Sequence, residues 1–189
     1  MRACYAVGMA LGSTIFKATL SIADIDRGYY RDHVLRIAQH PSETEERMMV
    51  RLLAFALHAD DALEFGRGLS ADDEPDLWQR DLTGLIIDWI DVGLPDVRDL
   101  RKASGRARNV HVLAYGGRAV DVWWTANQRE LARLPALSVM EVPQDASGAL
   151  AALADRAMNL SVTVQDGHVL VAAGADTVEI VPVVRKAVR

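Results

Sequence analysis

The 189-residue sequence contains little cysteine and little lysine, and it has no long apolar run. Its one cysteine, Cys4, can form neither an internal disulfide nor a cysteine-rich zinc site. No stretch of about 18 apolar residues is present, so we expect no transmembrane helix. Only Lys17, Lys102 and Lys186 are lysines among 21 basic residues, and the net charge is −5. That charge argues against a DNA-binding protein that depends on overall basicity.

The sequence does contain enough apolar residues to bury a core. Hydrophobic residues make up 50% of the chain and charged residues 25%. With this composition and length we expect one folded domain rather than a disordered chain. The first eight residues, MRACYAVG, lack the pattern of a secretory signal. We therefore expect a cytoplasmic bacterial protein.

The N-terminal third predicts two strands and then the clearest helix of the chain. Apolar alternation predicts strands over 14–22 and 29–38. Ser42 and Glu45 have the spacing of a capping box, so the helix should begin there and extend to about His58.

At about 100° per residue, that helix should bury one apolar stripe. The stripe consists of Met49, Leu52, Leu53 and Ala56. Arg47, Arg51 and His58 should face away from it. Glu45 falls near the middle of the stripe, which is an unusual place for a carboxylate.

The rest of the chain alternates strands and helices. A polar connection covers 66–81, and apolar residues on both faces predict a buried strand over 84–92. Next we expect a helix over 97–108, a strand over 109–115, a helix over 122–134, a strand over 137–142 and a helix over 146–157. Alternation around Asp166-Gly167 predicts a terminal hairpin within 159–184. Together these predict one α/β (α+β) domain, with a central mixed sheet flanked by helices and terminal β-hairpins.

Three carboxylates are candidates for a metal site. Glu45 lies on the first helix, and Asp76 follows Pro75 in a polar turn. Asp91 ends the buried strand, where ligands tend to meet a sheet of this kind. Asp88 lies on the opposite face of that strand from Asp91, so both cannot join one site. Converging carboxylates would favour Mg²⁺.

A purely structural interpretation of these carboxylates stays open. Glu45 can cap its helix and Asp76 can cap a turn, while Asp91 can pair with Arg101 or Arg106.

A basic stripe on the helix after the buried strand is a second candidate. Arg98, Lys102 and Arg106 recur every fourth residue, a pattern that would suit a phosphate backbone. A helical wheel places Lys102 nearly opposite the apolar stripe of this helix. The alternative is a solvated face that Asp96 and Asp99 partly neutralise.

Several long segments resemble the YaeQ family of bacterial proteins, in the same order along the chain. They include TIFKATLSIADIDRGYY, HPSETEERMMVRLLAFALHAD, LSADDEPDLWQRDLTG, WIDVGLPD, RKASGRAR and YGGRAVDVWW. The resemblance extends from about Met9 to Val183. It implies that residues 1–8 are an upstream extension and that residues 9–189 form the YaeQ-like domain.

The resemblance implies a variant of the PD-(D/E)XK nuclease-like fold, whose carboxylates hold Mg²⁺ for phosphodiester hydrolysis. Pro75-Asp76 matches the first half of that motif, Asp91 the strand acid and Glu45 the helix acid, with Gln79 as a weaker polar member. The usual lysine is missing, because Gly93 stands two residues after Asp91.

Two functions follow from the resemblance. In the first, Glu45, Asp76 and Asp91 hold Mg²⁺, and Lys102 polarises the phosphate. Three arginines would then contact the nucleic-acid backbone: Arg98, Arg101 and Arg106. In the second, the chain is a non-catalytic nucleic-acid- or protein-binding module that keeps the fold.

Overall fold

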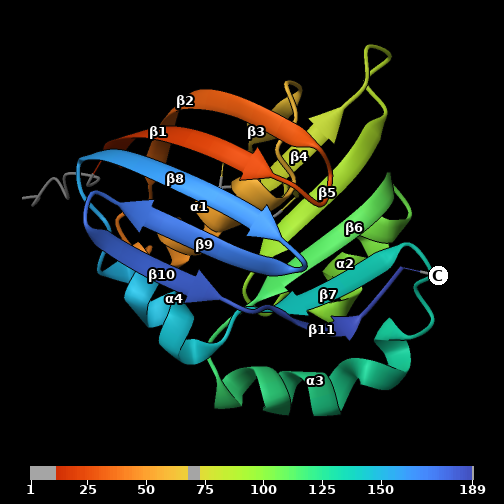
Figure 1. Ribbon diagram of the computed structural model, residues 1–189. Coiled ribbons are helices and arrows are strands. Elements are labelled where there is room, and N and C mark those ends of the chain that lie inside the picture. Colours follow the sequence, from red (N-terminus) through yellow and green to blue (C-terminus); the bar gives the residue numbers. More distant parts are fainter. Residues whose placement is uncertain (1–11, 68–72, 189) are drawn as a thin grey trace, which may run out of the picture.

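The computed structural model describes residues 12–67 and 73–188, and within them the strands form two sheets (Figure 1). Sheet A is built from both ends of the chain, in the order β10-β9-β8-β1-β2. Its strands are β1 (Thr14–Asp24), β2 (Tyr29–Gln39), β8 (Ala157–Gln165), β9 (His168–Ala173) and β10 (Asp176–Ile180). Because β1 pairs in parallel with β8, the N-terminal hairpin is joined to the C-terminal one.

Sheet B has the strand order β11-β7-β6-β5-β4-β3. Its strands are β3 (Leu63–Phe65), β4 (Leu77–Arg80), β5 (Ile86–Val92), β6 (Ala107–Ala114), β7 (Leu137–Glu141) and β11 (Val183–Lys186). The central strands β5, β6 and β7 are parallel, and their neighbours are antiparallel. The carboxyl ends of the three parallel strands therefore lie at one edge of the sheet.

The helices occupy two layers. They are α1 (Glu45–Leu57), α2 (Val97–Ser104), α3 (Arg118–Leu131) and α4 (Gln144–Ala151). Helix α1 packs between the two sheets beside α4, and residues 48–56 are all buried. Helices α2 and α3 cover the other face of sheet B, where a second core cluster forms around Trp89 (Figure 1).

The predicted fold class is confirmed, but the single predicted sheet is two sheets. The parallel pairing of β1 with β8 joins segments far apart in sequence, and no local sequence pattern predicts it. The hairpin at Asp166-Gly167 is confirmed, and both residues have the positive φ, 53° and 75°, that such a turn requires. Strand β4 lies inside the predicted polar connection, and the predicted extension of residues 1–8 lies outside the described residues.

None of the helices in the described ranges is long and apolar enough to cross a membrane. This agrees with the absence of a long apolar run in the sequence.

Candidate functional site

Asp76 and Asp91 lie side by side where β4 begins and β5 ends. Leu77 pairs with Ile90 in the antiparallel ladder, so the next position along places Asp76 opposite Asp91. The carboxylate of Asp76 accepts a hydrogen bond from the backbone N–H of Val92 at 2.8 Å. The structure therefore brings together two of the three predicted carboxylates.

Arg47 of α1 holds the carboxylate of Asp76. Its guanidinium donates to both oxygens, at 2.8 and 2.9 Å. The pair is enclosed, because the side chain of Asp76 is only 5% exposed and that of Arg47 17%. Both hydrogen bonds to Asp76 come from one nitrogen, Nη2, while Nη1 donates to Glu43, so one guanidinium joins the two carboxylates.

The pair belongs to a longer line of alternating charges. Glu43 accepts a hydrogen bond from Arg47 at 3.0 Å and another from Arg51 at 2.8 Å. Arg51 also donates to the backbone carbonyl of Ala38 in β2, at 3.0 Å. We name Arg51, Glu43, Arg47 and Asp76 the buried ion-pair chain. It connects sheet A, through α1, to the end of β5.

Asp91 lies on the face of β5 that carries Trp89, whose indole N–H donates to its carboxylate at 3.0 Å. Burial raises the pKa of Asp91 to about 7; the charge of Asp76 adds to this, and the hydrogen bond from Trp89 opposes it. The predicted pairing of Asp91 with Arg101 or Arg106 is absent from the described residues. Arg101 pairs with Glu130, and Arg106 lies over the ring of Trp89 at 5.1 Å.

Gly93 lies just after β5, two residues beyond Asp91, where the backbone bends. Its φ is +100°, a conformation that L residues with a side chain rarely adopt. A Cβ there would lie in ordinary van der Waals contact with the ring of Tyr115, at 3.8 Å, so it is the backbone conformation that favours glycine. Burial raises the pKa of Tyr115, which lies beside the start of α1 at the end of β6. A glycine therefore suits this bend better than a lysine.

Glu45 is not part of the site, and its predicted placement is wrong. Thr44 caps α1 by accepting from the N–H of Arg47 at 3.1 Å, and Ser42 instead hydrogen-bonds His40. Glu45 is the first residue of the helix and is exposed. The face predicted to be solvent-exposed contains Arg51, which is 2% exposed, because sheets cover α1 on both sides.

The basic residues of α2 face solvent, as the helical wheel places Lys102. Lys102 is 74% exposed and pairs with Asp99 at 2.8 Å, and Arg98 is 80% exposed and pairs with Asp96. Lys102 therefore makes its contact on its own helix rather than with Asp76 or Asp91.

Gln79 belongs to a different polar cluster. It pairs across the ladder with Asp88, whose carboxylate accepts from Asn109 at 2.9 Å and lies 3.2 Å from a ring nitrogen of His111. The ring of His58, at the end of α1, lies 4.4 Å from that of His111. Asp88 thus lies on the opposite face of β5 from Asp91, as alternation predicts.

Within the described ranges, no group of three or more His, Cys, Asp or Glu side chains is placed to hold a metal ion. Asp76 and Asp91 alone would be the protein ligands. That number suits Mg²⁺, which often binds one or two carboxylates and keeps several waters.

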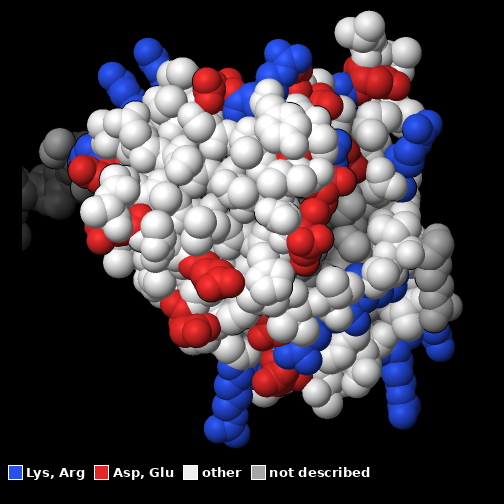
Figure 2. Space-filling model, in the orientation of Figure 1, with Lys and Arg blue, Asp and Glu red and all other residues white. Residues whose placement is uncertain are grey.

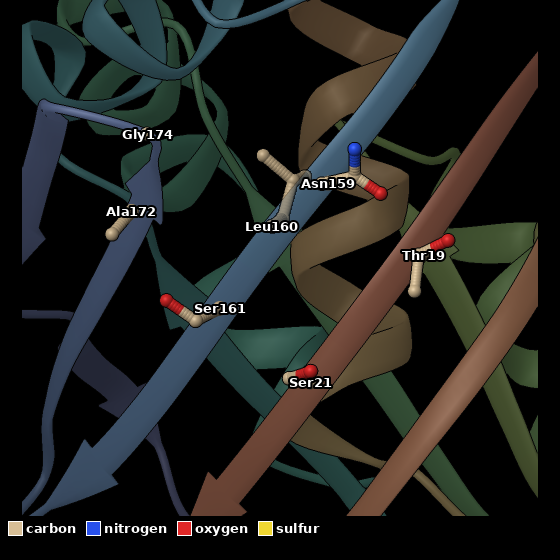
Figure 3. Close-up of a pocket in the computed structure, with 7 residues that line it drawn as sticks. All are labelled: Thr19, Ser21, Asn159, Leu160, Ser161, Ala172 and Gly174. Carbon is tan, nitrogen blue, oxygen red and sulfur yellow. The ribbon is translucent and has the colours of Figure 1, made fainter.

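A shallow depression on the outer face of sheet A offers little chemistry. Figure 3 shows its lining: Thr19, Ser21, Asn159, Leu160, Ser161, Ala172 and Gly174. Small hydroxyl and amide groups from three strands share this open surface, and none of the lining side chains is charged. We assign no reaction to it.

Sequence reasoning missed Glu43, Arg47, Arg51 and Tyr115. A signal was present, because Glu43, Arg47 and Arg51 recur every fourth residue. Such spacing predicts neighbours along one face of a helix, but not whether water or another layer covers that face.

The chain is similar to proteins of one bacterial family over most of its length. The family model described as "YaeQ protein" matches residues 9–182. The "Uncharacterized protein YaeQ" of Escherichia coli (strain K12) is 44% identical over 173 residues, which cover 91% of this chain and 95% of that protein. The protein of the same name from Shigella flexneri has the same identity and coverage.

Two crystal structures agree with the fold. That of the YaeQ protein from Xanthomonas axonopodis pv. citri has a TM-score of 0.90 and 52% identity, covering 93% of this chain and 99% of that one. That of the YaeQ protein from Pseudomonas syringae has a TM-score of 0.89 and 38% identity, covering 93% and 97%. With the matched segments, the strand order and these relatives in agreement, the chain belongs to the YaeQ family.

Proposed function

We propose that the end of β5 is a magnesium-dependent phosphodiester hydrolase site of the PD-(D/E)XK nuclease kind, acting on nucleic acid. One observation carries the proposal: two adjacent carboxylates, the buried Asp76 and the partly buried Asp91, lie near a single guanidinium, that of Arg47, which hydrogen-bonds Asp76. Burying two such charges is costly unless a cation offsets them. The raised pKa of Asp91 reflects this incomplete compensation.

Asp76 and Asp91 would hold the Mg²⁺ ion. When bound, the ion supplies an activated water and stabilises charge that develops on the phosphate. The backbone N–H of Val92 orients Asp76, and the indole of Trp89 orients Asp91. Both acids thus have neighbours that fix their direction before a ligand arrives.

Arg47 would supply the positive charge that a lysine provides in the usual motif. It reaches the site from α1 rather than from β5, so the conformation of Gly93 is no obstacle. A guanidinium suits this role because it can donate to two phosphate oxygens at once. We therefore move the cationic role from Lys102 to Arg47.

Arg98 and Arg101 of α2, and Arg106, which lies between α2 and β6, would contact the nucleic-acid backbone. Arg106 is the best placed of them, because it lies over Trp89, which in turn contacts Asp91. Arg98 and Arg101 are exposed, and each would have to leave its acidic partner, Asp96 or Glu130.

The second candidate is a non-catalytic binding module. Two observations favour it: Arg47 already occupies both oxygens of Asp76, and the basic residues of α2 are neutralised by ion pairs. Figure 2 adds that, on the face shown, acidic side chains lie near the middle and most basic ones towards the outline. A continuous basic surface for nucleic acid is not visible on that face.

The deciding experiment measures cleavage of DNA and RNA, single- and double-stranded, with Mg²⁺ or Mn²⁺. The wild type is compared with Asp91→Asn, with Arg47→Gln and with Lys102→Ala as the matched control. We expect cleavage by the wild type and the control, loss in Asp91→Asn and a strong decrease in Arg47→Gln. Circular dichroism confirms that each variant is folded.

Calorimetric titration of Mg²⁺ separates the two candidates. Equal cleavage by the wild type and Asp91→Asn would remove Asp91 from the site. Nucleic-acid binding without cleavage of any substrate, with no Mg²⁺ binding that depends on Asp91, would establish the binding module instead.

A further inference from the structure

Strand β2 is the longest edge strand among the described residues. It spans 11 residues, whereas the other edge strands, β10, β11 and β3, span 5, 4 and 3. All of β2 pairs with β1 without a register shift, and Figure 1 shows it along the outer border of sheet A. A long, regular edge is a ready template for another strand, so proteins usually shorten, bulge or cover such edges.

The backbone groups that point away from β1 can be identified from the ladder. The N–H of Lys17 donates to Arg156, towards β8, so the even-numbered residues of β1 bond to β2. Their partners are odd-numbered, as in the pair Phe16 and Ile37. The even-numbered residues of β2 therefore direct their N–H and C=O groups to the free edge. The carbonyl of Ala38 accordingly accepts from Arg51 rather than from β1.

The side chains of these even-numbered residues are also exposed. Val34 is 82% exposed and Tyr30 61%. Asp32 and Arg36 are exposed on either side of Val34, and neither has a hydrogen-bond or ion-pair partner in the described part of the chain. This edge thus offers outward backbone groups, an apolar centre and two unpaired opposite charges.

The order of these charges makes the edge complementary to itself. In an antiparallel pair centred on Val34, Val34 faces its own copy, and Asp32 of each chain faces Arg36 of the other. Two ion pairs form at once, and opposite charges on facing strands are favourable. Centring the pair on Asp32 or on Arg36 would instead place like charges opposite each other. One register is therefore preferred.

We propose that β2 pairs antiparallel with β2 of a second copy of this chain, centred on Val34, so that the two copies of sheet A form one continuous sheet. The interface is isologous, because each copy contributes the same residues. Residues 32, 34 and 36 supply the backbone hydrogen bonds, and the side chains of the same residues set the register.

The first test is the mass in solution, by sedimentation velocity from about 1 µM to about 300 µM. We expect a dimer, with twice the 20.7 kDa mass of the chain, and its fraction should increase with protein concentration. Asp32→Arg alone and Arg36→Asp alone should each weaken the dimer at least roughly tenfold, because both ion pairs become repulsive. The double exchange Asp32→Arg with Arg36→Asp should restore it.

Two further variants locate the interface. Val34→Pro removes an outward amide that β1 does not use, so the fold should persist while the dimer is lost. Glu179→Arg, on the other edge strand β10, is the matched control and should leave the dimer unchanged. A monomer at every concentration overturns the proposal, and so does a dimer insensitive to Asp32→Arg. Loss of the dimer in Glu179→Arg alone would assign the interface to β10.

Discussion

Helices α1 and α2 both carry basic residues at helical spacing, yet the two sets behave oppositely. Arg47 and Arg51 of α1 are enclosed and belong to the buried ion-pair chain. Arg98 and Lys102 of α2 are more than 70% exposed and pair with acids of their own segment. In sequence, each set is an ordinary basic stripe.

The layers of the fold produce this difference. Sheets cover α1 on both sides, so its charged groups must find partners inside the protein. Helix α2 covers only one face of sheet B, so water solvates its outer side and weakens its ion pairs. The same residue type is therefore structural in one helix and nearly neutral for stability in the other.

The largest effect is expected for the enclosed arginines of α1. Arg51→Ala would leave the buried Glu43 with Arg47 as its remaining ion-pair partner, besides a hydrogen bond from the backbone N–H of His40. We expect the free energy of unfolding to fall by about 3–5 kcal/mol, measured by urea denaturation. Combining Arg51→Met with Glu43→Gln should recover part of the loss, since no unpaired charge stays buried. A loss below about 1 kcal/mol for Arg51→Ala would contradict the structural role.

A smaller effect concerns His58, at the end of α1. Burial lowers its pKa from 6.5 to about 3; the neighbouring His111 and Arg27 lower it further, and Asp88 opposes them. In the unfolded chain the ring of His58 therefore binds a proton as the pH falls below about 6.5, whereas in the folded protein it stays neutral until the pH is much lower. Stability should be complete above pH 6.5 and should decrease as the pH falls towards 3, by about 2 kcal/mol between pH 7 and pH 5.

The variant His58→Gln tests this assignment. It keeps the backbone N–H that caps α1 and removes the titrating ring. Unfolding measured at pH 7 and pH 5 should show a smaller difference in the variant than in the wild type. If the free energy of unfolding falls by the same amount between pH 7 and pH 5 in both proteins, a group other than His58 is responsible for the pH dependence.

The smallest effect is expected on α2. Arg98→Ala and Lys102→Ala each remove an exposed ion pair. The free energy of unfolding should change by no more than about 0.5 kcal/mol. A larger loss in either variant would mean that α2 also depends on its charges, and the contrast with α1 would disappear.

Local sequence signals were enough to find the two carboxylates. Asp91 is the last residue but one of a strand with apolar residues on both faces and lies two residues before Gly93, and Asp76 follows a proline in a polar turn. Each position is defined by its neighbours in sequence. The antiparallel pairing of β4 with β5 then places them together.

The remainder of the site depends on tertiary structure. Choosing Glu43 over Glu45 requires knowing that α1 begins after Thr44. Recognising Arg51 as buried requires knowing that a second sheet lies on that side of α1. The second sheet in turn depends on the pairing of β1 with β8, which is a long-range event without a local signature.

The pairing of β1 with β8 also orders events in time during synthesis. The N-terminal hairpin and α1 leave the ribosome long before residues 157–165, which provide the partner of β1. Until then, the apolar side chains of β1 and much of α1 have no complete layer to cover them. Long-range parallel pairing is intrinsically slow, and uncovered strands are prone to aggregate. The interval before β8 emerges is thus when the nascent chain most needs protection.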